Sequence, residues 1–107
     1  MNKLASLLSL TRKAGKLVWG FDAVKEAVEK KKAGLVLLAN DLSPKSRKEI
    51  ALVCQKSGVS VQRLPMSMDE VWFSVGKRAG ILAVTEEGLA GKLAQMAGDA
   101  NKEESAL

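Results

Sequence analysis

Apolar residues recur along this chain in two alternating patterns, one with the spacing of helices and one in short unbroken runs. Positions three and four residues apart line one face of a helix, and five segments show that spacing. Four short segments between them are rich in apolar residues, as in strands of a covered sheet. The predicted helices span residues 3–13, 21–32, 44–56, 68–75 and 86–97, and the predicted strands span 16–19, 35–39, 59–64 and 81–84.

Capping signals support several of these boundaries. Ser43 precedes Pro44, and a serine cap followed by proline at the first helical position is a typical helix start. Ser67, with Glu70 three residues later, has the capping-box pattern. Thr85 is predicted to cap the last helix.

The alternation of helices and strands indicates an α/β protein, because helices then cover both faces of one sheet. The predicted fold is a three-layer α/β/α sandwich. Residues 1–97 are assigned to a single domain, and residues 98–107, which are small and polar, to a flexible tail. Trp72 is expected to point into the core with its neighbours, and Cys54 is expected to be a small core residue.

Composition excludes several classes of protein. The longest apolar runs are about five residues, far below the roughly 20 that cross a membrane. Arg12 and Lys13 interrupt the leucines near the N-terminus, so this segment is interpreted as an amphipathic helix rather than a signal peptide, and a cytoplasmic location follows. One cysteine and no histidine leave no disulfide, no zinc cluster and no Cys/His catalytic pair. Without a catalytic constellation or a nucleotide fingerprint, we expect neither an enzyme nor a cofactor.

Positive charge is concentrated in the first half of the chain. Residues 1–48 carry 11 lysines and arginines and 4 acidic residues, a balance of +7, whereas residues 49–107 carry 6 and 8, a balance of −2. A basic half on a small domain is typical of proteins that bind nucleic acid. The alternative is a solvated basic face that has no partner.

The segment Gly15–Asp22 is the strongest candidate for a binding site. A short predicted strand ends before Gly20, which opens a helix, and the exposed N–H groups of a helix start attract anions such as phosphate. Lys16 and Lys25 flank this start, and more lysines lie at positions 13 and 30–32. The pattern favours a polyphosphate such as RNA as the partner.

A second candidate is the loop Gly76–Gly80, in which Lys77 and Arg78 stand between glycines. Such cations can approach a phosphate backbone closely, although a plain polar turn is the alternative. In an α/β fold this loop could lie beside Gly20, which favours the binding role.

Aromatic residues are scarce, with two tryptophans, two phenylalanines and no tyrosine. A stacking surface for single strands needs exposed rings among basic residues, so composition argues against one. Trp19 and Phe21 flank Gly20, and their rings could either stack on a base or pack beneath the first helix.

A family resemblance rests on the order and spacing of four segments: Leu10–Lys16, Gly20 at a helix start, Leu35–Asp41 followed by Pro44, and Gly76–Thr85. Together they resemble the ribosomal protein L-seven-A-e family, in particular its short bacterial YlxQ-like members, over about residues 3–97. The resemblance implies a Pelota-like fold with a four-stranded mixed sheet between helical layers. It also implies binding of sharply kinked (kink-turn) RNA, with guanine edges read from one helix start and an extruded base covered by a loop near the last strand.

The family's RNA-binding signature is Gly-x-Asn-Glu-x-x-Lys, and only Gly20 matches it in this chain. Asp22 stands at the Asn position and can accept but not donate a hydrogen bond. Ala23 replaces the Glu, and Glu26 replaces the Lys and would repel phosphate. Lys25 lies one residue away, about 100° around the helix.

Sequence and resemblance together favour a non-catalytic RNA-binding protein of the ribosomal-protein type, acting in translation or in a ribonucleoprotein of a bacterial cytoplasm. The expected partner is structured RNA, either ribosomal or a kink-turn RNA, with no membrane contact and with a monomer favoured. The alternative is a protein-interaction module on the same fold that has lost specific RNA recognition, as Asp22, Ala23 and Glu26 suggest. The expected RNA-binding residues are Lys16, Gly20, Phe21, Asp22, Lys25, Lys77 and Arg78.

Overall fold

A four-stranded mixed sheet with the order β1-β4-β2-β3 forms the centre of the molecule. The computed structural model describes residues 3–106, and the side chains of residues 3–101. β2 pairs with β3 in parallel, and β4 runs antiparallel to both of its neighbours, β1 and β2. The strands are β1 (Leu17–Trp19), β2 (Leu35–Leu38), β3 (Ser60–Arg63) and β4 (Ile81–Val84). The mixed four-stranded sheet is therefore confirmed.

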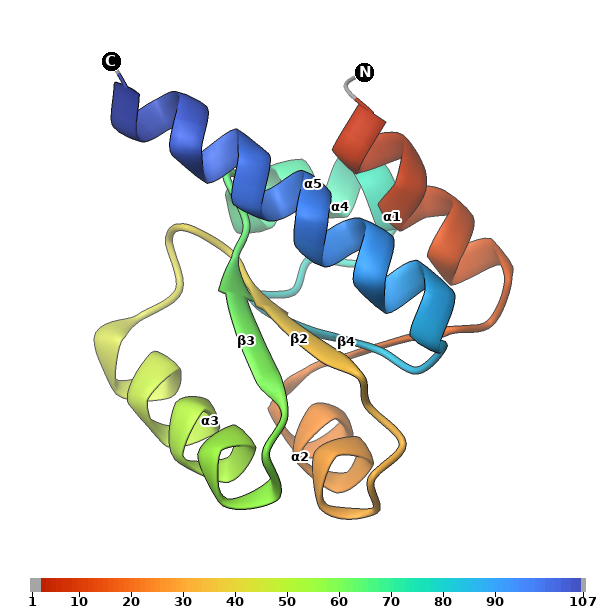
Figure 1. Ribbon diagram of the computed structural model, residues 1–107, viewed down its shortest axis with the longest axis vertical. Helices are drawn as coiled ribbons and strands as arrows, with labels where there is room; N and C mark the ends of the chain where they lie inside the picture. The colour runs from red at the N-terminus through yellow and green to blue at the C-terminus, as the bar shows by residue number, and fades with distance from the viewer. Residues whose placement is uncertain (1–2, 107) are drawn as a thin grey trace.

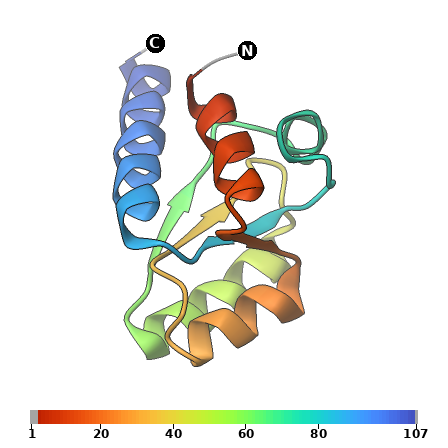
Figure 2. The same ribbon diagram turned by 90° about the vertical axis from the view of Figure 1, so that its right-hand side faces the viewer.

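Helices cover both faces of this sheet (Figures 1 and 2). Figure 2 shows the sheet lying between the two helical layers. The first layer consists of α1 (Lys3–Lys13), α4 (Met68–Val75) and α5 (Glu87–Ala106), and the second of α2 (Phe21–Glu29) and α3 (Pro44–Ser57). The three-layer α/β/α architecture agrees with the prediction.

The central strands β2 and β4 are buried along their whole length and divide the interior into two cores. Successive side chains of a strand point to opposite faces. Leu35 and Leu37 accordingly pack with the α1, α4 and α5 layer, whereas Val36 and Leu38 pack with α2 and α3. This double burial explains why β2 has an unbroken apolar sequence. Cys54 is fully buried in the second core, as predicted.

The start and the end of α5 differ from the prediction. The capping side chain is Glu86 rather than Thr85, because the Glu86 carboxylate accepts hydrogen bonds from the backbone N of Gly88 (2.8 Å) and of Leu89 (2.7 Å). These two bonds lower the pKa of Glu86, with a smaller contribution from the charge of Lys16.

α5 also continues as a helix to Ala106, beyond residue 97, where the predicted helix ends and the predicted flexible tail begins. Small and polar residues do not prevent this, because alanine and glutamate are good helix formers. Ala97 is buried, and the Asn101 side chain donates to the backbone O of Arg63 (2.9 Å), so the helix stays attached to the β3 edge beyond the predicted boundary. The flexibility of residues 98–107 remains a prediction.

The prediction for Trp72 is wrong, since its side chain is 53% exposed. The buried residues of α4 are Val71, Ser74 and Val75, and they lie close together on one face of the helix. Each residue advances about 100° around a helix, so Trp72 falls to the side of that face and Phe73 roughly opposite to it. Phe73 is accordingly 83% exposed.

Candidate nucleic-acid interface

The start of α2 is formed by Gly20, in a backbone conformation that suits glycine. Its φ of 93° lies in the left-handed half of conformational space, where side chains are strained. Gly20 N donates to Ile81 O (3.0 Å), and Gly20 O accepts from Val24 N (3.0 Å). The residue therefore joins the start of β4 to the start of α2. Gly20 provides no side-chain cap. The N–H groups of the first turn therefore remain available to an external acceptor.

The loop Gly76–Gly80 lies beside this helix start, as the sequence suggested. The contact is made through Ile81, the residue that follows the loop and accepts the hydrogen bond from Gly20. Gly76 ends α4 in a left-handed conformation, with φ of 77°. Lys77 and Arg78 follow it and are exposed. Two segments about sixty residues apart in the chain thus meet where β1 ends and β4 begins.

Arg12 connects the two segments and was missing from the predicted site. Its guanidinium lies 5.2 Å from the centre of the Trp19 ring, and its Nη1 donates to the backbone O of Val75, the last residue of α4. A Cβ at Gly76 would lie 2.7 Å from Arg12 Nη1, so glycine leaves the space that Arg12 occupies. The sequence offered only a cation in the last turn of α1, which the helix dipole alone could explain.

The two aromatic residues beside Gly20 are both half-buried. Trp19 packs against the core beneath α1 and α5, and Phe21 packs against the core of α2 and α3. Each ring therefore has a packing role. Asp22 and Ala23 are exposed in the first turn of α2.

Lys16 is separated from the other predicted residues by the length of β1. Its backbone O accepts from Thr85 N (2.9 Å), so it lies at the Thr85 end of this edge strand, while Gly20 lies at the other end. Four residues of strand span about 13 Å. Lys25 is exposed one turn into α2. The structure therefore groups Gly20, Asp22 and the loop, and places the two lysines at its flanks.

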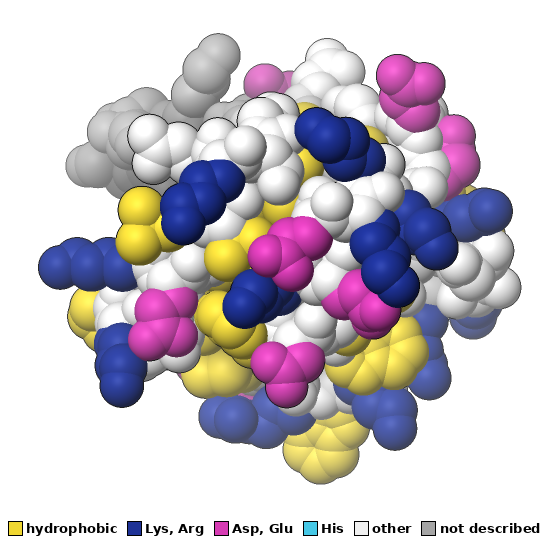
Figure 3. Space-filling model, turned by 90° about the horizontal axis from the view of Figure 1, so that it is seen from below, with side chains coloured by type: hydrophobic (Ala, Val, Ile, Leu, Met, Phe, Trp, Pro, Cys, Tyr) yellow, Lys and Arg dark blue, Asp and Glu magenta, His cyan; other side chains and the backbone are white. Residues whose placement is uncertain are grey.

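Glu26 has a local partner, since its Oε1 lies 2.7 Å from Lys30 Nζ. The hydrogen bond and charge of Lys30 lower the pKa of Glu26. The pair lies beside a surface hollow of about 620 Å³ that includes Lys31 and Lys32. Figure 3 shows the α2 and α3 side of the molecule, where Lys and Arg side chains are interspersed with Asp and Glu, and where hydrophobic side chains are exposed at the lower margin.

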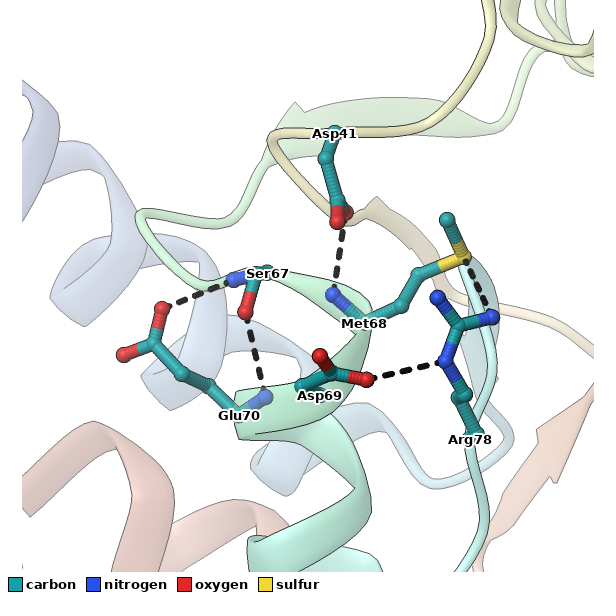
Figure 4. Close-up of polar contacts among 6 residues, drawn as sticks. All are labelled: Asp41, Ser67, Met68, Asp69, Glu70 and Arg78. Atoms are coloured by element: carbon teal, nitrogen blue, oxygen red, sulfur yellow. Dashed lines mark hydrogen bonds and ion pairs between the residues drawn. The ribbon is translucent and has the colours of Figure 1, made fainter.

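Arg78 reaches back along α4 rather than standing free (Figure 4). Its Nε lies 2.9 Å from Asp69 Oδ1, and its Nη1 is 3.9 Å from the sulfur of Met68. Both members of the Arg78–Asp69 pair are exposed, so the pair is partly screened by solvent. Some of the charge of Arg78 is therefore already matched within the protein.

The first turn of α4 is fixed by two further contacts (Figure 4). Asp41 Oδ1 accepts from Met68 N (2.9 Å), which gives this carboxylate a structural role after β2. Ser67 and Glu70 form the predicted capping box, with Glu70 N donating to Ser67 Oγ (3.2 Å) and Ser67 N donating to Glu70 Oε1 (3.0 Å). α4 is thereby held at its start, while Arg12 holds its end.

Trp72 and Phe73 form an exposed aromatic pair on α4 that composition alone did not suggest. Their ring centres are 6.1 Å apart, and their planes differ by 26°. The signal that could have found them is the helical face Val71, Ser74 and Val75, which leaves both rings outside. Among the residues that the structure describes, no three or more His, Cys, Asp or Glu side chains come together as a metal site, and no helix is long and apolar enough to span a bilayer.

This fold is that of a ribosomal-protein-type α/β domain. The chain belongs to the ribosomal protein L7Ae/L30e/S12e/Gadd45 family, whose model matches residues 2–94. It is 35% identical over 88 residues to the RNA-binding protein YlxQ of Bacillus subtilis (strain 168), covering 81% of this chain and 87% of that protein.

Two solved structures share the fold. A Bacillus halodurans protein of unknown function is 25% identical, with a TM-score of 0.86 over 92% of this chain and 99% of the other. The Giardia lamblia 15.5kD RNA binding protein is 17% identical, with a TM-score of 0.74 over 90% of this chain and 85% of that one. The second likeness bears on the fold alone.

Proposed function

We propose that this protein is a non-catalytic RNA-binding protein of the ribosomal-protein type that holds a kinked, structured RNA at the start of α2. The observation that carries the proposal is the uncapped helix start at Gly20, adjoining the cationic loop Gly76–Gly80. Membership of the family and the likeness to a bacterial RNA-binding protein support it.

The helix start would bind RNA mainly through backbone groups and charge. N–H groups of the first turn of α2 would donate to phosphate or base oxygens, and Asp22 would accept from a guanine edge. Lys77 would neutralise a phosphate at the same place. Lys16 and Lys25 would contact phosphates on either side, because β1 and the first turn of α2 separate them from the loop.

The partner would be a kink-turn RNA or another folded RNA, such as ribosomal RNA, within a ribonucleoprotein that serves translation. We place this activity in a bacterial cytoplasm and assign it to a monomer. The RNA-binding unit would be the domain of residues 1–97.

Two glycine variants test the proposal, because each adds a Cβ at a residue with positive φ. Gly20 and Gly58 both have positive φ, 93° and 71°, and a Cβ at either meets nothing within 4 Å. Gly58 ends α3, away from the helix start. Gly58→Ala places alanine in the left-handed helical region and should cost about 1–2 kcal/mol of stability. Gly20→Ala should cost more, up to about 3 kcal/mol, because a φ of 93° with a ψ of 151° is a conformation that almost only glycine adopts.

Affinity for a kink-turn RNA is then measured for the wild type and both variants, with an unkinked duplex as the comparison RNA. We expect the wild type to prefer the kink-turn, by less than about tenfold because the signature side chains are replaced. Gly20→Ala should weaken binding while Gly58→Ala leaves it unchanged. The proposal would be contradicted if the wild type bound neither RNA at low salt. It would also be contradicted if Gly20→Ala and Gly58→Ala lost RNA affinity equally.

A second candidate function is a protein-interaction module on the same fold. The specific observation in its favour is that Glu26, at the signature lysine position, is paired with Lys30 in the structure. It predicts that no RNA binds above the non-specific level, so the titration above separates the two functions.

A further inference from the structure

The aromatic pair on α4 is a large exposed apolar surface that belongs to neither hydrophobic core. Phe73 is 83% exposed and Trp72 is 53% exposed, and the two rings are nearly parallel. Exposed apolar surface of this kind usually marks a site of interaction. The flat faces of stacked rings suit another flat ring, and a nucleobase presents one.

The support beneath the rings is rigid. α4 is anchored at its first turn by the bond from Met68 N to Asp41 and by the capping box. Its last residue, Val75, accepts a hydrogen bond from Arg12. The inward residues of α4 are buried in the core beneath α1 and α5. A rigid support lowers the entropy lost when a ligand stacks on the rings.

The charges around the pair favour a nucleotide over an apolar protein segment. A helix C-terminus is partly negative and disfavours phosphate, but Arg12 brings a cation to the last carbonyl of α4. Asp69, one turn before Phe73, is paired with Arg78. Lys77 follows Gly76, the C-cap of the helix, and is exposed. A phosphate attached to a stacked base would therefore meet cations at this end of α4.

The aromatic pair is also continuous with the Gly20 helix start. Trp72 O accepts from Gly76 N, which places the loop Gly76–Gly80 directly after the rings. The same loop leads to Ile81, which is bonded to Gly20, and Arg12 links Val75 to Trp19 on the other side. One RNA strand leaving the helix start can pass the loop and reach the rings.

We propose that Trp72 and Phe73 bind an unpaired base by stacking it on their rings. The base would belong to a single strand that extends from the folded part of the RNA. The inference rests on the proposed function, because it assumes that the neighbouring helix start and loop contact RNA. It adds a single-strand contact that the Gly20 site does not supply.

The test uses three RNAs that share one kink-turn: a blunt form, a form with a single-stranded extension of five adenosines, and a form with the same extension made abasic. The abasic extension keeps the phosphates and removes the rings. The wild type should bind the adenosine form at least about fivefold more tightly than the abasic form, which is the effect of stacking one base. Phe73→Ala should reduce that difference in affinity, and the double variant Trp72→Ala, Phe73→Ala should remove it.

Leu52→Ala serves as the control, since Leu52 is 57% exposed on α3, across the sheet from α4, and should keep the difference. A 2-aminopurine in the extension gives a second readout, because stacking quenches its fluorescence in the wild type and not in Phe73→Ala. Equal binding of the adenosine and abasic forms by the wild type, or a difference that survives in the double variant, overturns the inference and leaves the proposed function intact. If the wild type does not bind the blunt kink-turn RNA, the proposed function is refuted instead.

Discussion

The guanidinium of Arg12 lies over the ring of Trp19, at 5.2 Å from its centre, and the same guanidinium donates to the backbone O of Val75. Arg12 therefore joins the end of α1 to the end of α4 and to the residue before Gly20. A planar guanidinium can stack on a ring and donate to a carbonyl at once, which an ammonium does less well.

Replacing Arg12 by lysine should therefore destabilise the domain and weaken the proposed site. We expect Arg12→Lys to lower the free energy of unfolding by about 1–2 kcal/mol, from the weaker ring contact and the altered hydrogen bond. Urea unfolding measures the loss. Lys13→Ala removes an exposed cation from the same helix turn and should change stability little. Because Arg12→Lys keeps the positive charge, an unchanged free energy of unfolding in this variant would mean that Arg12 acts only through its charge.

The ion pair between Arg78 and Asp69 should limit the contribution of Arg78 to RNA binding. Asp69→Asn releases the guanidinium and removes a negative charge, so it should tighten RNA binding by about two- to fivefold. Arg78→Ala should weaken binding less than Lys77→Ala does. Filter-binding titrations at one salt concentration compare the three variants, and weaker binding by Asp69→Asn would show that the pair positions Arg78 for RNA.

RNA affinity should fall steeply as salt rises, because cations that neutralise phosphates release counterions. Lys16→Ala and Lys77→Ala should each lower affinity for all RNA sequences and reduce the slope of log K against log salt by about one. The salt series is measured for each variant with two unrelated RNA sequences. A change in sequence preference alone would refute the phosphate role assigned to these lysines.

The helix elements and the sheet could be predicted because their signals are local. Apolar spacing, the Ser67 capping box and the unbroken run Leu35–Ala39 depend on neighbours in the sequence, and the structure has a helix start or a strand at each. The orientation of Trp72 was misjudged because its hydrophobicity was weighed above its place around the helix. The roles of Arg12 and Arg78 depend on partners that are distant in sequence or on the other side of a turn, and no local pattern marks them.

The free energy of unfolding should depend on pH through Glu86, the capping residue of α5. Hydrogen bonds from Leu89 and Gly88 hold the pKa of Glu86 below its ordinary value of 4.5. The cap therefore contributes fully above that ordinary value, and its contribution is lost as pH falls through the lowered pKa of the folded state. Urea unfolding between pH 6 and roughly pH 3 should show a smaller decline for Glu86→Gln than for the wild type. Glu87→Gln is the control, and an identical decline in both variants would exclude the cap as the cause.

Restoring the family signature on α2 should raise the preference for kinked RNA. The combined change Asp22→Asn, Ala23→Glu, Glu26→Lys adds an amide donor, a carboxylate and a cation on one helical turn. Each well-placed bidentate base contact contributes about 1–3 kcal/mol of discrimination, so the triple variant should prefer a kink-turn over a duplex by about tenfold or more.

The same variant should also be less stable than the wild type. Glu26→Lys removes the ion pair with Lys30 and places two lysines four residues apart, where they repel. Titrations against both RNAs and a urea unfolding curve measure the two effects. Tight kink-turn binding by the wild type with no gain in the triple variant would mean that the backbone around Gly20 carries the recognition.

Amide chemical shifts during titration with a kink-turn RNA show whether the start of α2 and the loop after α4 together form the RNA contact. We expect the largest changes in chemical shift on residues 20–23 and 76–80, with the amides of α3 nearly unchanged. Largest changes on α3 or α5, with residues 20–23 unaffected, would contradict this expectation.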